Sequence, residues 1–71
     1  MREKIRESII YALADHFVAH INKHKVNVEI MLQNPMAIHE HTDLMSAIEN
    51  ELAQMAEYMD KLEALEMFKS E

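Results

Sequence analysis

The sequence lacks cysteine, glycine and tryptophan, and Pro35 is its only proline. The absence of cysteine excludes a disulfide framework, a thiolate metal site and a cysteine nucleophile. The absence of glycine excludes a phosphate-binding glycine loop, and the few serines stand in no serine–histidine–acid pattern. We therefore expect no enzyme, no cofactor and no small-molecule substrate.

Long apolar runs are also missing. None approaches the roughly 18 residues of a membrane span, and the start MREKIRESII lacks the apolar stretch of a signal peptide. Aromatic residues make up only 6%, but aliphatic residues bring the apolar fraction to 49%, which argues against wholesale disorder. The chain is expected to fold in the cytoplasm, away from membranes.

Positive charge is scarce and unevenly placed. The net charge is −6; residues 2–33 hold five basic and four acidic side chains, whereas residues 42–71 hold eight acidic side chains and two lysines. Such a chain has no broad basic surface on which to release phosphate counterions. Nucleic acid is therefore not an expected partner.

A chain of 71 residues makes one domain, residues 1–71, with a marginal core. At this length only about 60% of the unfolded surface is buried. Because disulfides are absent, association with another chain is the simplest additional source of stability.

The first segment, about residues 2–33, has the periodicity of one long helix. Its apolar residues recur at alternating steps of four and three: Ile10, Ala14, Phe17, Ile21, His24, Val28 and Met31. Ile9, Leu13, Val18 and Leu32 flank that line. The stretch KVNVEIML would also suit a strand, but the helical register continues through it.

Pro35 disfavours the helical conformation at Asn34 and predicts a linker over about residues 34–42. A second helix is expected over about residues 43–69. Thr42 or Asp43 could cap it, and Glu40 and Asp43 suit its positive end. Its apolar line is Met45, Ile48, Leu52, Met55, Met59 and Leu62, with Leu44, Leu65 and Phe68 beside it.

Two helices of similar length joined by a short linker predict an all-α fold, a two-helix antiparallel hairpin. This would bring the basic tip, Arg2, Lys4 and Arg6, near Glu63, Glu66 and Glu71. Neither helix alone can cover the other's wide apolar stripe, so a homodimer forming a four-helix bundle is expected. The expected interface residues are Phe17, Ile21, Val28, Ile48, Leu52, Met55, Met59 and Leu62.

Two groups of histidines are candidate metal ligands. His16, His20 and His24 recur every four residues on one helix face, where two imidazoles could chelate an ion. His39 and His41 bracket Glu40 in the linker. We favour the alternatives, a hydrogen-bonded core histidine at His24 and a polar bend in the linker, and expect no metal.

The acidic residues Glu57, Asp60, Glu63 and Glu66 have spacings that resemble the magnesium-binding carboxylates of all-helical nucleotide pyrophosphohydrolases. Their order departs from that family and they lie on the polar side of the helix, so we favour a solvated face over a magnesium site. Methionines at 31, 36, 45, 55, 59 and 67 fit either a core or an adaptable groove for a partner.

The run from His24 to Leu65 resembles a group of small uncharacterised helical-hairpin proteins of T-even-like tailed bacteriophages, including marine ones. In these, a run N-P-x-x-I-x-E-H-x-D joins an N-V-E-I-like helix to one ending in D-K-L-E-x-L. The matching residues are Asn34, Pro35, Ile38, Glu40, His41 and Asp43, then Asp60, Lys61, Leu62, Glu63 and Leu65. The resemblance implies a phage or host-cytoplasm origin and no activity; the glycine of the family's linker is absent here.

Three hypotheses follow from these observations. The first is a non-enzymatic helical interaction protein, a homodimer that acts on a host or phage protein. The second is a histidine-based metal-binding helical protein, and the third is a magnesium-dependent nucleotide hydrolase that uses the acidic residues.

Overall fold

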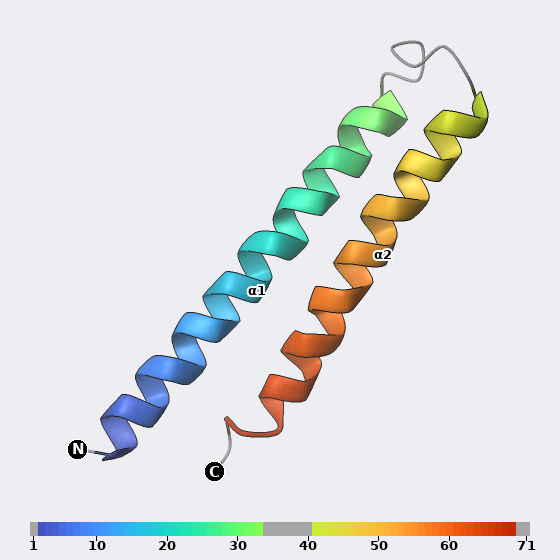
Figure 1. Cartoon of the computed structure of the whole chain (residues 1–71). Coiled ribbons are helices and arrows are strands. Elements are labelled where there is room, and N and C mark those ends of the chain that lie inside the picture. The colour runs from blue at the N-terminus through green and yellow to red at the C-terminus, as the bar shows by residue number, and fades with distance from the viewer. Residues whose placement is uncertain (1, 34–40, 70–71) are drawn as a thin grey trace.

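The structure of the chain is a computed structural model that describes residues 2–33 and 41–69. It contains two helices, α1 (Arg2–Gln33) and α2 (His41–Glu66), and a turn at 67–69 (Figure 1). Within these ranges there is no strand. The prediction of an all-α chain is therefore confirmed.

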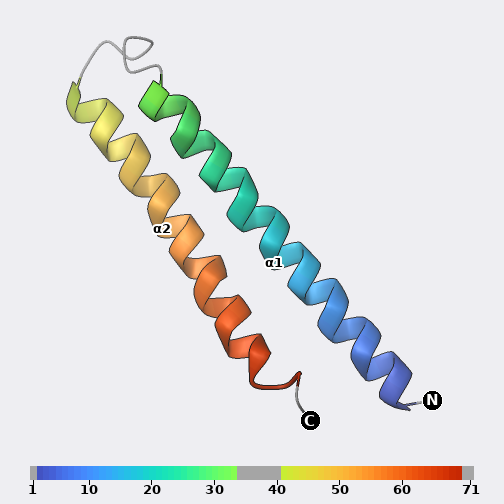
Figure 2. The ribbon, with the colours of Figure 1, turned by 180° about the vertical axis from the view of Figure 1, so that it is seen from behind.

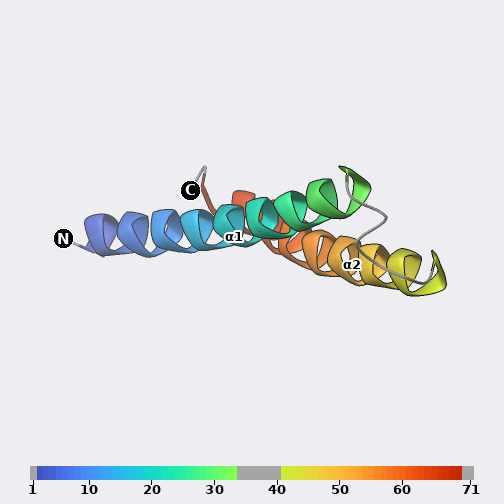
Figure 3. The ribbon, with the colours of Figure 1, turned by 90° about the horizontal axis from the view of Figure 1, so that it is seen from above.

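The helices lie antiparallel as a hairpin, which was also predicted. In Figures 1 and 2, α1 begins at the end of the rod where α2 finishes. The molecule measures 56 × 15 × 12 Å, and the view in Figure 3 shows the two helices crossing at a shallow slant.

The helix bounds agree closely with the periodicity. Helix α1 covers the predicted range and includes KVNVEIML, because its apolar register against α2 continues through that stretch. Helix α2 starts two residues before the predicted position and ends at Glu66, where 67–69 form a tighter turn. There Met67, Phe68 and Lys69 each donate a backbone hydrogen bond to the carbonyl three residues earlier. The residues of the linker before His41 lie outside the described part.

The two helices meet along one line of residues, which we call the seam. On α1 the seam is the predicted line, and all its members are buried or half-buried: Ile10, Ala14, Phe17, Ile21, His24, Val28 and Met31. On α2 it consists of Leu44, Ile48, Glu51, Met55, Tyr58, Leu62 and Leu65, all half-buried. Both lines advance by four and three residues, the spacing of packed helices.

The predicted apolar line of α2 is only half right within the chain. Met45, Leu52 and Met59 are 71%, 49% and 52% exposed. Glu51 and Tyr58 take the places facing α1 because they bond and stack with side chains of that helix. The expected role of Leu52 and Met59 in an interface between chains stays a prediction.

The expected ion pairs between the ends of the hairpin are not present among the described residues. Arg6 instead donates a hydrogen bond from Nη2 to the backbone carbonyl of Phe68 at 2.8 Å, and Glu66 pairs with Lys69 at 3.0 Å. The turn after α2 presents free carbonyls to α1, so a carbonyl takes the place of a carboxylate. Glu71 lies outside the described residues.

Candidate functional site

A polar contact lies in the middle of the otherwise apolar seam. His24, on α1, is only 4% exposed, and its Nδ1 donates to Glu51 Oε2 of α2 at 2.5 Å. Asn27 Nδ2 donates to the other oxygen of the same carboxylate at 3.1 Å. A buried polar group needs such partners, so these bonds fix how α2 faces α1. The expectation of a hydrogen-bonded core histidine at His24 is confirmed.

An aromatic group adjoins this contact toward the ends of the chain. The rings of His20 and Tyr58 stack at a centroid distance of 4.3 Å and an interplanar angle of 8°. His16 meets His20 edge to face at 4.5 Å, and Lys61 Nζ lies 4.8 Å from the Tyr58 ring centroid on α2. The stack joins the two helices, with His20 of α1 lying on Tyr58 of α2.

Two titratable groups respond to this environment. Burial lowers the pKa of His20 below 6.5, and the charges of His16 and Lys23 lower it further. The hydrogen bond from His24 lowers the pKa of the Glu51 carboxyl below 4.5, opposed in part by burial and assisted by Asn27. The lowered pKa values favour a neutral His20 and an ionised Glu51 at neutral pH.

The three histidines of α1 do not converge on one point. His24 is committed to Glu51, His20 lies against Tyr58, and His16 is exposed. Among the described residues, no group of three or more histidine, aspartate and glutamate side chains could hold a metal ion. His39 lies outside these residues, and His41 begins α2. Metal binding at the linker histidines therefore stays untested.

The acidic residues of α2 stand on its exposed surface and are spread along it. Glu57, Asp60, Glu63 and Glu66 are all exposed. Glu57 pairs with Lys61 of the same helix at 3.7 Å, and Glu66 pairs with Lys69 of the turn that follows. This arrangement is that of a solvated face. Of the methionines, Met31 and Met55 lie in the seam, whereas Met67 is 74% exposed and Met36 is outside the described residues.

Sequence reasoning missed Glu51, Tyr58 and Asn27 as partners of the histidines. A signal was present, since Glu51 and Tyr58 complete the four-and-three line Leu44, Ile48, Glu51, Met55, Tyr58, Leu62 and Leu65. That line is less apolar than its neighbour because it contains a carboxylate. A ranking by hydrophobicity alone therefore passes over it.

The hydrogen bonds of Glu51 and the stack of His20 on Tyr58 hold the two helices in register. Comparison of the chain with protein families, with curated proteins and with solved structures gives no match. Neither of the described helices is both long and apolar enough to cross a membrane.

Proposed function

We propose that the protein is a non-enzymatic helical interaction protein, a homo-oligomer that acts on another protein. One observation carries this proposal: the hairpin buries very little of its own apolar surface. Among the described residues the buried apolar side chains are Ile10 and Ala14, whereas these are more than half exposed: Ile5, Ile9, Tyr11, Val26, Ile30, Leu32, Met45, Met59, Met67 and Phe68. A core this small gives an isolated hairpin marginal stability.

The exposed apolar residues lie on more than one side of the rod. The outward side of α1 carries a second line at four-and-three spacing, which we call the outer stripe: Ile5, Ile9, Ala12, Ala19, Val26 and Ile30. His16 and Lys23 fall in the same line. A surface that exposes more apolar stripes than one neighbour can cover supports both self-association and a further protein partner.

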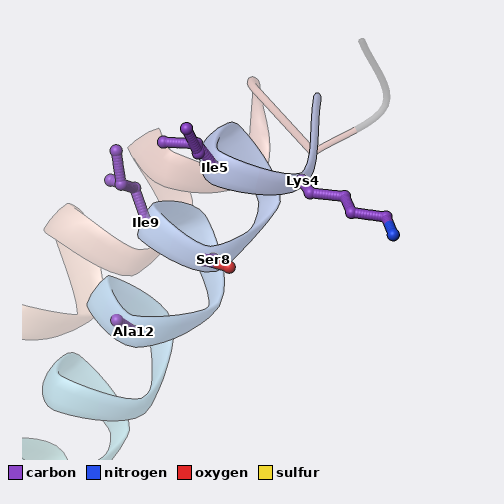
Figure 4. Close-up of a pocket in the computed structure, with 5 residues that line it drawn as sticks. All are labelled: Lys4, Ile5, Ser8, Ile9 and Ala12. Carbon is purple, nitrogen blue, oxygen red and sulfur yellow. The ribbon is translucent and has the colours of Figure 1, made fainter. Parts of the chain in front are cut away.

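The outer stripe is slightly hollowed near the start of α1. Lys4, Ile5, Ser8, Ile9 and Ala12 line a shallow depression there, and Figure 4 shows Ile5 and Ile9 pointing together while Lys4 points away. An open apolar depression with a lysine at its edge fits contact with another protein better than enclosure of a small molecule.

A phage origin is part of the proposal and rests on the resemblance of the run from His24 to Leu65. The alternatives gain no comparable support. The histidines of α1 are divided between the seam and the surface, and the carboxylates of α2 stand apart along an exposed face.

Light scattering of the purified protein at micromolar concentration tests the proposal. The expected result is a dimer or a larger oligomer, with a helical circular dichroism spectrum. In a second experiment, purification from phage-infected cells is expected to bring down a partner protein. A well-folded monomer would overturn self-association, and magnesium-dependent turnover of nucleotides would overturn the non-enzymatic assignment.

A further inference from the structure

The hairpin has two long sides, and helix geometry assigns residues to each. Successive residues of a helix are turned by about 100°. In two antiparallel helices that face each other, the residue that follows a seam residue lies on the same side of the pair in both helices. Residues that directly follow alternate seam positions therefore share one side, which we call the open face: Tyr11, Val18, Lys25 and Leu32 of α1, and Met45, Leu52, Met59 and Glu66 of α2.

The contacts within the chain agree with this assignment, because they lie on the other side. That polar side holds residues that directly precede alternate seam positions, among them His20 and Asn27 on α1 and Lys61 on α2. Arg6 continues the same line of α1, fourteen residues before His20. The bond from Arg6 to Phe68, the stack of His20 on Tyr58 and the position of Lys61 over Tyr58 all belong to it. Arg6, His20 and Asn27 are half-buried there.

The open face differs from the polar side in both burial and polarity. All its residues are exposed, and six of the eight are apolar or aromatic: Tyr11, Val18, Leu32, Met45, Leu52 and Met59. The chain thus covers part of its polar side and leaves its apolar side uncovered. Because burial of apolar surface drives association, the open face gains from a partner, and unlike the outer stripe of α1 it draws on both helices.

The exposed area is large enough for a stable contact. The chain exposes 5887 Å². A compact monomer of this size exposes about 4,600 Å². The difference belongs to the whole elongated chain, and it is larger than the roughly 800 Å² that each partner buries in a standard interface.

We propose that the open face binds the open face of a second copy of this chain, with both linkers at the same end, so that each α1 packs on the partner's α2. The inference rests on the proposed self-association and specifies its surface and symmetry. Both faces are flat pairs of antiparallel helices with the same apolar composition, so each complements the other across a two-fold axis parallel to the helices. This packing makes all neighbouring helices antiparallel.

Charge selects this arrangement over the opposite one. Helix α1 has five basic and four acidic side chains, whereas α2 has seven acidic side chains and one lysine. With the linkers at opposite ends, each α2 would lie against the partner's equally acidic α2. With the linkers together, each acidic α2 meets an α1 of slight positive charge, which is the complementary pairing.

A matched pair of substitutions tests the surface. Leu52→Asp places a charge in the centre of the open face, whereas Ala53→Asp places the same charge on an exposed neighbour outside it. Leu52→Asp is expected to raise the dissociation constant of the dimer at least about tenfold, since a charge buried without a partner is unfavourable. Ala53→Asp should leave the constant nearly unchanged. A Leu52→Asp protein that dimerises as tightly as the Ala53→Asp protein would overturn the inference.

Distances between spin labels test the symmetry without disturbing the face, because the chain contains no native cysteine. Ser8→Cys and Asn22→Cys put labels on one exposed side of α1, near its start and near its middle. In the proposed dimer, both pairs of labels lie at equal heights along the rod and give similar distances. With the linkers at opposite ends, the Ser8 pair would be separated by about 40 Å along the axis, at about 1.5 Å per residue, while the Asn22 pair stays close.

The outcomes are distinguishable. A wild-type monomer would overturn the proposed self-association itself. A wild-type dimer that tolerates Leu52→Asp, or one with a long Ser8 distance, would leave self-association standing and overturn the surface or the symmetry inferred here.

Discussion

At the residue scale, Glu51 determines which face of α2 meets α1. Its two carboxylate oxygens accept hydrogen bonds from His24 and Asn27, so rotation of α2 about its axis would leave the buried histidine nitrogen without a partner. Leaving a buried polar group unpaired costs about 1–3 kcal/mol, which is similar to the gain from burying Leu52 or Met59, and the rotation would also break the stack of His20 on Tyr58. The polar contact therefore overrides the more apolar line of α2.

The first prediction tests this contact. His24→Ala is expected to lower the free energy of unfolding by about 1–3 kcal/mol, because it removes a buried ring and its hydrogen bond. Replacing both partners, His24→Leu with Glu51→Leu, should recover much of that loss, since only the half-buried amide of Asn27 then lacks its partner. Urea unfolding measures both.

Asn22→Ala, on the exposed side of α1, is the matched control and should change stability by less than about 0.5 kcal/mol. A double leucine variant as unstable as His24→Ala would show that the polar contact contributes specific packing rather than hydrogen bonding alone.

The second prediction concerns pH. The pKa of His20 is lowered in the fold, so below the unfolded value of 6.5 the unfolded chain binds more protons and stability falls as pH falls. The pKa of Glu51 is also lowered, so its stabilisation is present above 4.5 and is lost as pH falls through the folded value. The melting temperature should therefore decrease on acidification in two stages.

His20→Gln should flatten the first stage and Glu51→Gln the second, each measured by circular dichroism against the wild-type curve. A wild-type melting temperature that rises between pH 7 and pH 5 would contradict the assignment of His20.

At the scale of elements, the absence of glycine is visible at the end of α2. Helices often end on a left-handed residue, usually glycine, and no residue among the described ones has a positive φ. Instead α2 closes through three backbone bonds to carbonyls three residues back. Its beginning is also shifted from expectation, which puts Asp43 inside the first turn rather than at the cap.

The third prediction follows from that position. Asp43→Ala should reduce stability by about 0.3–1 kcal/mol, because the carboxylate then no longer faces the positive end of the helix dipole. Asp60→Ala, also exposed but nearer the other end of α2, should change stability by less than about 0.5 kcal/mol. Thermal unfolding of the two variants side by side would decide, and equal losses would argue against a dipole effect.

The elements themselves could be predicted from the sequence. Four-and-three spacing identified the seam of α1, from Ile10 to Met31, and the predicted range of that helix agrees with the described one, Arg2–Gln33. The rotation of α2 could not be predicted, because it depends on which side chain of α1 meets Glu51, a contact between residues far apart in the chain. The bond of Arg6 to the carbonyl of Phe68, in place of a carboxylate, could not be predicted either, because it depends on how the turn after α2 lies against α1.

At the scale of the whole molecule, stability and association are linked in the proposed dimer. Because the folded pair is favoured by mass action, the melting temperature should rise with protein concentration. Calorimetry over a hundredfold range of concentration measures this. Leu52→Asp should weaken the dependence and Ala53→Asp should retain it; a wild-type melting temperature that does not change with concentration would contradict the link.

Helix α1 begins at the same end of the hairpin at which α2 finishes (Figure 1). In a pair with both linkers together, the four chain ends would gather at the opposite end. A short polar tether could then connect the end of one copy to the start of the next without traversing the 56 Å length of the rod. Such a tandem chain would turn association into an intramolecular step at an effective concentration in the millimolar range. Duplication of the coding sequence would thus yield a single-chain four-helix protein whose two halves are free to diverge.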